Sequence, residues 1–398
     1  MHSIARQPRL HVLLAICGLL TGAVVPASAQ QSVTDVMTFL LTNRSIPTGD
    51  FVRDEQAAVE TRDVLARFLS LELATIPVSS SSGGFTYRLD PTLGMAVRSS
   101  DSFGPFFTER SLTSGRHQAS LGIGYRSTTF DNIDGRDLRD GTLVSTASIL
   151  RGEPAPFDIE TVTLRIRTDT MTVTGNYGVT DRFDIGGAIP VVRVSLQGQR
   201  VDTYRGRALI QATGSATASG LGDVVVRAKY NLVRDGASGL AVAGEARLPT
   251  GNEENLLGTG SASLTPRLIG SYERDRLGIH GELGYSFREA SNSLGYAVAA
   301  TVVAAPRLTI VGELSGLRLG GLGRLAETTQ PHPGLVGVNT LRLTGVEQTT
   351  NRLVAVAGLK WNIADAWLVT ANLRRPLTSV GLNADWVPTL TLDYAFGR

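Results

Sequence analysis

Apolar residues alternate with polar residues or glycine from about residue 118 to residue 396. In the stretch 221–233, for example, Val226, Ala228 and Tyr230 alternate with Arg227 and Lys229. A period of two is typical of β-strands whose two faces have different surroundings. The alternation predicts strands at 117–127, 168–179, 182–194, 221–233, 238–249, 262–273, 276–288, 294–304, 307–317, 350–363, 366–377 and 385–396.

The connections between these strands alternate in length. Those at 180–181, 234–237, 274–275, 305–306 and 364–365 are tight, whereas those at 128–167, 195–220, 250–261 and 318–349 are long. An even number of strands, with tight turns at one end and long loops at the other, is typical of outer-membrane barrels. We therefore predict an all-β fold: a transmembrane, antiparallel up-and-down β-barrel of about twelve strands, with its turns in the periplasm.

Aromatic residues near the strand ends give an independent test of the predicted membrane barrel. One group lies beside the tight turns or the C-terminus and comprises Tyr177, Phe183, Tyr230, Tyr272, Trp361, Trp367, Tyr394 and Phe396. A second group lies at the opposite ends and comprises Tyr125, Tyr285, Phe287, Tyr296 and Trp386. Membrane barrels place such residues in the headgroup layers. A water-soluble β-sandwich also alternates, but it has no reason to sort aromatic residues by height.

Charged residues of a membrane barrel have to face the lumen, because hydrocarbon solvates neither charges nor unpaired backbone amides. Arg193, Arg318 and Arg375 break this phase, and each lies near the predicted outer rim. The predicted lumen-lining residues are Arg126, Asp184, Asp223, Arg227, Lys229, Glu245, Arg247, Arg267, His280, Glu282, Glu313, Lys360, Arg374 and Asp393.

The N-terminal residues differ from the strand region. Arg6 and Arg9 precede an apolar run that ends at Ala27-Ser28-Ala29, which predicts a cleaved signal peptide over 1–29. Residues 30–78 have helical spacing, with Ser32 as the expected cap of the first helix. This segment is interpreted either as a periplasmic helical hairpin or as a plug folded into the barrel. Residues 79–116 form a linker and lead-in, and residues 117–398 form the barrel.

Composition excludes several classes of function. Cys17 is the sole cysteine and lies in the leader, so the mature chain has no thiol for a disulfide, a zinc site or a nucleophile. No G-x-S-x-G motif accompanies the mature histidines, His117, His280 and His332. We interpret His280 and Glu282, two apart on one strand face, as a structural pair. We expect no catalytic residue, no cofactor and no metal site, and therefore no enzyme. A net charge of +2 indicates no nucleic-acid partner.

A series of short motifs resembles a known family. It runs Gly220-Leu221-Gly222-Asp223, then Ala228-Lys229-Tyr230, then Leu248-Pro249-Thr250-Gly251, then Gly258-Thr259-Gly260. These motifs are similar to those of the outer-membrane barrel family named for the phenol meta-cleavage pathway. The resemblance is good over 220–287, weaker out to Phe396, and does not cover 30–115. It implies transport without naming a substrate.

The leading hypothesis is a porin-like outer-membrane channel of a Gram-negative bacterium. It would take up small solutes passively, with hydrophobic or aromatic ones as candidates. Its expected partners are outer-membrane lipid, a small-molecule solute and the barrel-insertion machinery. The alternative is a barrel that transports nothing and serves as an anchor or as an adhesin-like surface protein.

Overall fold

The computed structural model describes residues 31–43, 50–74, 84–90, 95–288, 292–321 and 323–396. The signal peptide expected at 1–29 lies outside these residues. None of the helices in the described part of the chain combines the length and the apolar character that crossing a membrane requires.

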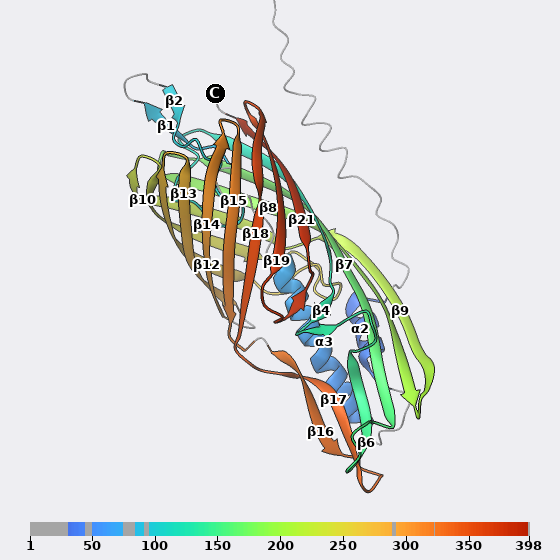
Figure 1. Cartoon of the computed structure of the whole chain (residues 1–398). Coiled ribbons are helices and arrows are strands. Elements are labelled where there is room, and N and C mark those ends of the chain that lie inside the picture. Colours follow the sequence, from blue (N-terminus) through green and yellow to red (C-terminus); the bar gives the residue numbers. More distant parts are fainter. Residues whose placement is uncertain are drawn as a thin grey trace, which may run out of the picture. The chain divides into compact units, whose positions relative to one another are not determined.

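Twelve antiparallel strands form a closed barrel (Figure 1). They are β3 (Ala119–Thr129), β7 (Asp158–Gly178), β8 (Phe183–Tyr204), β10 (Val224–Asp235), β11 (Ser238–Leu248), β12 (Ser263–Arg274), β13 (Leu277–Arg288), β14 (Ser293–Ala305), β15 (Leu308–Leu319), β18 (Thr350–Ala364), β19 (Trp367–Pro376) and β21 (Val387–Phe396). Pairing of β7 with β8 closes the ring, so no barrel strand has a free edge. The predicted all-β barrel is confirmed, and each expected strand corresponds to one of these.

The two faces of the barrel wall differ as the alternation predicts. On β10, Val226 and Tyr230 are exposed on the outside, whereas Arg227 and Lys229 are buried inside. Aromatic side chains are exposed near both ends of the wall. They include Tyr177, Tyr230, Tyr272, Trp361 and Trp367 at the tight turns, and Tyr125, Tyr285, Phe287, Tyr296 and Trp386 at the other end. An apolar band between two aromatic belts is the surface that a bilayer covers.

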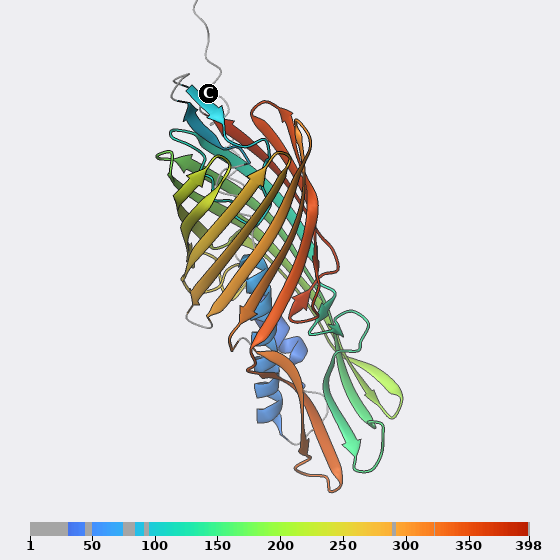
Figure 2. The ribbon, with the colours of Figure 1, turned by 60° about the vertical axis from the view of Figure 1, so that its left-hand side comes forward.

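Further strands continue from β7 and β8 beyond the barrel (Figure 2). β9 (Arg207–Leu221) pairs with β8, and β6 (Val144–Leu150) pairs with β7. β17 (Val338–Val346) and β16 (Arg324–Pro331) follow β6 in the same sheet. The prediction of long loops over 128–167, 195–220 and 318–349 is therefore wrong for the parts that these strands occupy. Alanine, serine, threonine and glycine fill most of β9, so its alternation of apolar residues is weak.

The remaining strands are short. β1 (Tyr87–Asp90) pairs with β2 (Met95–Arg98), and β20 (Leu382–Asn383), β4 (Asn132–Ile133) and β5 (Arg136–Asp137) form a small sheet.

In the described residues before the barrel there are two helices, α2 (Val33–Leu41) and α3 (Phe51–Ala74). Ser32 caps α2 as expected: its hydroxyl accepts the Asp35 N–H at 3.0 Å, and the Asp35 carboxylate accepts the Ser32 N–H at 3.2 Å. The apolar face of α2 packs on β8 and β9, and α3 packs on β16, β17 and β20. Both helices therefore lie at the end of the barrel that carries the long connections, and the last turn of α3 enters the lumen.

Candidate solute pathway in the barrel lumen

The fourteen residues predicted to line the lumen are all buried or half-buried in the structure. Their contacts divide them into three sets. Asp184, Arg227, Lys229, Glu282, Glu313 and Lys360 contact residues 99–116, which we call the inner segment. Arg126, Arg247 and Arg374 contact the end of α3. Asp223, Glu245, Arg267 and His280 contact neighbouring strands or a loop, and Asp393 accepts the hydroxyl of Thr391 on its own strand.

Inward side chains hold the inner segment by its backbone. Lys229 Nζ donates to the carbonyl oxygens of Arg110, at 3.0 Å, and Leu112, at 2.6 Å. The Glu313 carboxylate accepts the three backbone N–H groups at 106–108. A charged group that bonds to several backbone groups fixes a loop and satisfies amides that water does not reach.

The same kind of contact recurs on other strands. Lys360 Nζ donates to the carbonyl oxygens of Phe103, at 3.2 Å, and Pro105, at 2.5 Å. The Asp184 carboxylate accepts the backbone N–H of Ser114 at 2.8 Å. Residues from β8, β10, β15 and β18 thus converge on the inner segment, which occupies the half of the lumen near the tight turns.

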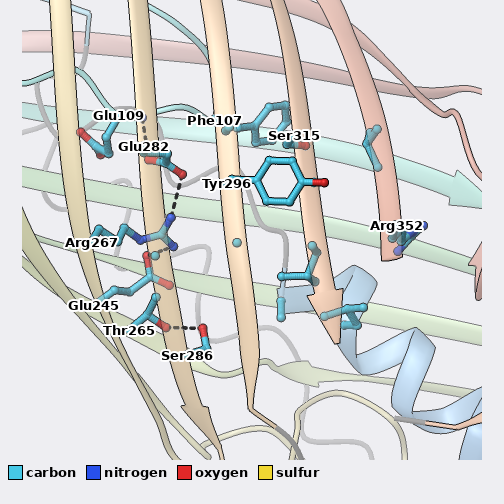
Figure 3. Close-up of a pocket in the computed structure, with 18 of the residues that line it drawn as sticks. Phe107, Glu109, Glu245, Thr265, Arg267, Glu282, Ser286, Tyr296, Ser315 and Arg352 are labelled. Atoms are coloured by element: carbon cyan, nitrogen blue, oxygen red, sulfur yellow. Dashed lines mark hydrogen bonds and ion pairs between the residues drawn. The ribbon is translucent and has the colours of Figure 1, made fainter. Parts of the chain in front are cut away.

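A network of carboxylates and arginines lies beneath the inner segment (Figure 3). Glu109 forms an ion pair with Arg227, and its backbone N–H donates to Glu282 at 3.0 Å. The Arg267 guanidinium bridges Glu282, at 2.9 Å, and Glu245, at 3.2 Å. Each of these charges has an opposite charge beside it, which offsets the cost of removing it from water.

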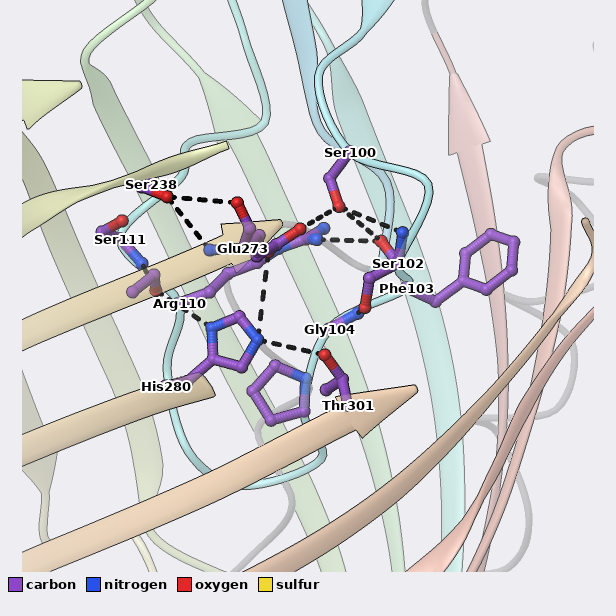
Figure 4. A network of polar contacts seen from close by, with 12 residues as sticks. Ser100, Ser102, Phe103, Gly104, Arg110, Ser111, Ser238, Glu273, His280 and Thr301 are labelled. Carbon is purple, nitrogen blue, oxygen red and sulfur yellow. Dashed lines mark hydrogen bonds and ion pairs between the residues drawn. The ribbon is translucent and has the colours of Figure 1, made fainter. Parts of the chain in front are cut away.

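His280 belongs to a separate network nearer the tight turns (Figure 4). Its Nδ1 lies 3.0 Å from the Ser271 hydroxyl, and its Nε2 lies 3.4 Å from the Thr301 hydroxyl and 3.9 Å from a Glu273 carboxylate oxygen. Its carboxylate neighbour is therefore Glu273 and not Glu282, although Glu282 is closer in sequence. The hydroxyl partners give His280 a structural role.

The last turn of α3 meets a group of arginines. Glu72 forms ion pairs with Arg374, at 2.7 Å, and with Arg352, and the Arg126 guanidinium donates to the Glu72 carbonyl oxygen at 2.9 Å. Burial alone would raise the pKa of Glu72, but Arg352 and Arg374 outweigh it and lower that pKa to about 2. Arg247 donates to the carbonyl oxygen of Ala74 at 2.7 Å. Strands β3, β11, β18 and β19 therefore hold the end of this helix.

Asp223 connects three of the four motifs singled out in the sequence, those at 220–223, 248–251 and 258–260. Its carboxylate accepts the backbone N–H groups of Gly251, at 3.1 Å, and Thr259, at 2.8 Å, and also the Thr259 hydroxyl, at 2.7 Å. A Cβ on Gly258 would lie 2.3 Å from the Asp223 carboxylate and 2.7 Å from Gly251 Cα, so only glycine fits there. These residues form a clamp between β10 and the 249–262 loop.

A cavity of about 200 Å³ separates the two obstructions of the lumen. Phe107 and Glu109 of the inner segment line one end, and Leu71 and Ala74 of α3 line the other. Small residues of β13 and β14 line part of the wall between them, including Gly284, Gly295 and Ala297, as do several arginines.

The sequence prediction missed four charged residues of this region. Arg288 and Arg352 share the strand phase of Ser286 and Lys360, so the alternation contained the signal for both. Glu72 and Glu109 lie outside the barrel strands, and no sequence pattern places them in the lumen.

The out-of-phase arginines lie on the outer face. Arg193, Arg318 and Arg375 are exposed, and the Arg375 guanidinium lies 4.8 Å from the ring centre of Trp386.

Among the residues that the structure describes, no three His, Cys, Asp or Glu side chains gather as metal ligands.

Comparisons with known proteins agree with the resemblance seen in the motifs. Residues 138–313 match the family model described as "Putative MetA-pathway of phenol degradation". The resemblance is thereby confirmed, over a stretch that begins earlier than the motifs. The comparison with curated proteins found no match.

Several solved outer-membrane barrels are similar in architecture. The COG4313 outer membrane channel from Pseudomonas putida F1 is 11% identical, with 72% of this chain and 98% of that chain covered and a TM-score of 0.48. The translocator domain of the autotransporter NalP from Neisseria meningitidis is 12% identical, with 71% and 89% covered and a TM-score of 0.34. The CymD monoaromatic hydrocarbon channel is 9% identical, with 71% and 90% covered and a TM-score of 0.29.

Proposed function

We propose that the protein is an outer-membrane channel through which small solutes diffuse passively, hydrophobic and aromatic ones included. The observation that carries this proposal is a closed barrel with an apolar outer face and a charged lumen that contains a cavity. A cylinder with this distribution of polarity is stable in a bilayer because its backbone amides are paired and its charges face inward.

The proposed location of the protein, the outer membrane, follows from the same distribution of apolar and charged side chains. Lipid would cover the exposed apolar residues between the aromatic belts, and the signal peptide expected at 1–29 would direct export. Barrel-insertion machinery would then be a partner during assembly. The aromatic Phe396 ends β21, although Gly397 and Arg398 follow it in the sequence.

The inner segment and the end of α3 both obstruct the lumen, so we infer that transport needs a movement. The inner segment is held by side chains of several strands, whereas the end of α3 is held mainly through Glu72 and the carbonyl oxygen of Ala74. We propose that residues 30–78 act as a plug and that withdrawal of the end of α3 removes the obstruction at the end of the lumen that carries the long connections.

Recording of the full mature chain in planar bilayers tests this proposal. A Glu72→Lys variant places a cation among Arg126, Arg352 and Arg374, so we expect its conductance to exceed that of the unmodified chain at least threefold. Glu55→Lys, on the exposed face of the same helix, is the matched control and should leave the conductance unchanged. Absence of conductance in all three proteins would overturn the channel function.

One observation favours the alternative of a surface-binding protein. Apolar side chains are exposed at the tips of two hairpins beyond the barrel, namely Tyr204, Leu209 and Ile210 in one and Leu335 and Val336 in the other. Exposed apolar residues at loop tips are typical of binding surfaces. If replacing them by serine abolished binding to a surface without changing conductance, binding would be a separate function.

A further inference from the structure

The cavity between the inner segment and α3 has an excess of positive charge. Six arginines line it, at 227, 247, 267, 288, 352 and 374, against three glutamates, at 109, 245 and 282. Glu72 adds a fourth carboxylate beside the cavity. The six arginines therefore outnumber the four carboxylates, and a cavity with this excess of positive charge attracts an anion.

Arg288 is the lining arginine that forms no ion pair within 4 Å in the described part of the chain, although Glu245 acts on it electrostatically from farther away. Arg227 pairs with Glu109, Arg247 and Arg267 pair with Glu245, and Arg352 and Arg374 pair with Glu72. No described carboxylate lies within 4 Å of the Arg288 guanidinium, and its buried Nε has no hydrogen-bond partner there. A guanidinium in this situation is suited to bind a carboxylate with two parallel hydrogen bonds.

The rest of the lining suits an apolar body attached to such a charge. Gly284 and Gly295 lie opposite each other on β13 and β14 and both line the cavity, so this part of its wall carries no side chains. Farther along, Phe107 packs against a cluster that contains Val354 and Val356, and all three line the cavity. At about 200 Å³ the cavity is larger than engineered cavities of about 150 Å³ that bind benzene.

We propose that this cavity is a binding site for a small organic anion, a carboxylate on an apolar or aromatic body. Arg288 receives the carboxylate, and Phe107 with Val354 and Val356 contacts the apolar body. The inference rests on the proposed function, because it names the class of solute that stops in the lumen on its way through. It goes further than the hydrophobic and aromatic solutes considered above, because it requires the negative charge.

Benzoate is the probe for this site, with benzamide as its uncharged counterpart. Calorimetric titration of the full mature chain in detergent should show saturable binding of one benzoate, with benzamide and acetate each at least tenfold weaker. Arg288→Gln should weaken benzoate binding at least tenfold. Arg318→Gln, on the outer face of β15, is the matched control and should bind benzoate as the unmodified chain does.

Three outcomes would overturn the inference: no saturable benzoate binding, equal binding of benzoate and benzamide, or unchanged benzoate affinity in Arg288→Gln. Acetate or chloride binding as tightly as benzoate would assign the site to any anion and would also contradict it. Conductance of Glu72→Lys, recorded on the same preparations, separates the two proposals. If Glu72→Lys conducts but the chain does not bind benzoate, only the anion-site proposal is wrong. If the chain binds benzoate but Glu72→Lys does not conduct, the channel proposal is wrong and the anion-site proposal stands.

Discussion

The Glu72 carboxylate lies 2.7 Å from the Arg374 guanidinium, although 302 positions separate them in the sequence. Arg352 pairs with the same carboxylate, and Arg126 donates to the Glu72 carbonyl oxygen. Three strands of the barrel wall thus meet at one residue of α3. These arginines face the lumen and hold the helix end there. Under the proposed plug role, the strength of this contact decides how easily the helix end withdraws.

The low pKa of Glu72 gives this contact a defined pH dependence. A carboxyl group whose pKa falls from 4.5 to about 2 on folding stabilises the folded state above pH 4.5 and loses that contribution as the pH falls toward 2. Glu72→Gln should therefore lower the free energy of unfolding by about 3 kcal/mol at pH 7 and by much less at pH 3. Urea unfolding in detergent, followed by tryptophan fluorescence, measures both values. An equal difference at both pH values would contradict this account.

The alternation along the strands predicts the position of some of these charged residues but not of others. The position of Arg374 inside the barrel follows from its strand phase, because a strand that separates lipid from lumen allows each residue only one face. Its partner does not follow, since Glu72 belongs to a helix whose location depends on tertiary packing. The same reason applies to Glu109. It belongs to the inner segment, and no periodicity in the sequence indicates that this segment lies in the lumen.

Lys229 gives a second test, directed at the inner segment. Replacement by methionine keeps the unbranched apolar part of the side chain but removes the donor to the carbonyl oxygens of Arg110 and Leu112. Because a buried partner is lost, we expect a destabilisation of about 3 kcal/mol. Trypsin should then cleave after Arg110 or Arg116 in the folded barrel at least tenfold faster than in the unmodified chain. Arg193→Met, on the outer face, should show no such change, and equal protection of both variants would refute the role of Lys229.

Asp223 gives a third test, at the opposite end of the barrel. Asp223→Ala removes the acceptor for the N–H groups of Gly251 and Thr259, which leaves the 249–262 loop without its clamp. We expect a loss of stability of about 1–3 kcal/mol and faster proteolysis within the loop on intact cells. Glu254→Ala is the control, because that side chain is exposed. Loop cleavage at the same rate in both variants would show that the clamp does not hold the loop.

The long connections show what the alternation could not reveal. The sequence predicted loops where β6, β9, β16 and β17 are found, because these strands pair beyond the barrel and pack around α2 and α3. Small and polar side chains make up much of β9 and β16, so the contrast that marks a lipid-facing strand is weak there. Strand pairing there depends on partners distant in sequence, as β17 with β6 illustrates.

The three tryptophans provide a test of the membrane itself. Trp361, Trp367 and Trp386 are the tryptophans of the chain, and their exposed fractions on the outer face are 52%, 40% and 53%. If lipid surrounds the barrel, brominated phospholipids should quench more than half of the tryptophan fluorescence of the reconstituted protein, because bromine quenches only at close contact. Vesicles of the same lipid without bromine are the control, and a gel shift between boiled and unboiled samples verifies folding. Fluorescence that brominated lipid leaves unchanged, in protein that shows the shift, would mean that the aromatic belts do not face a bilayer.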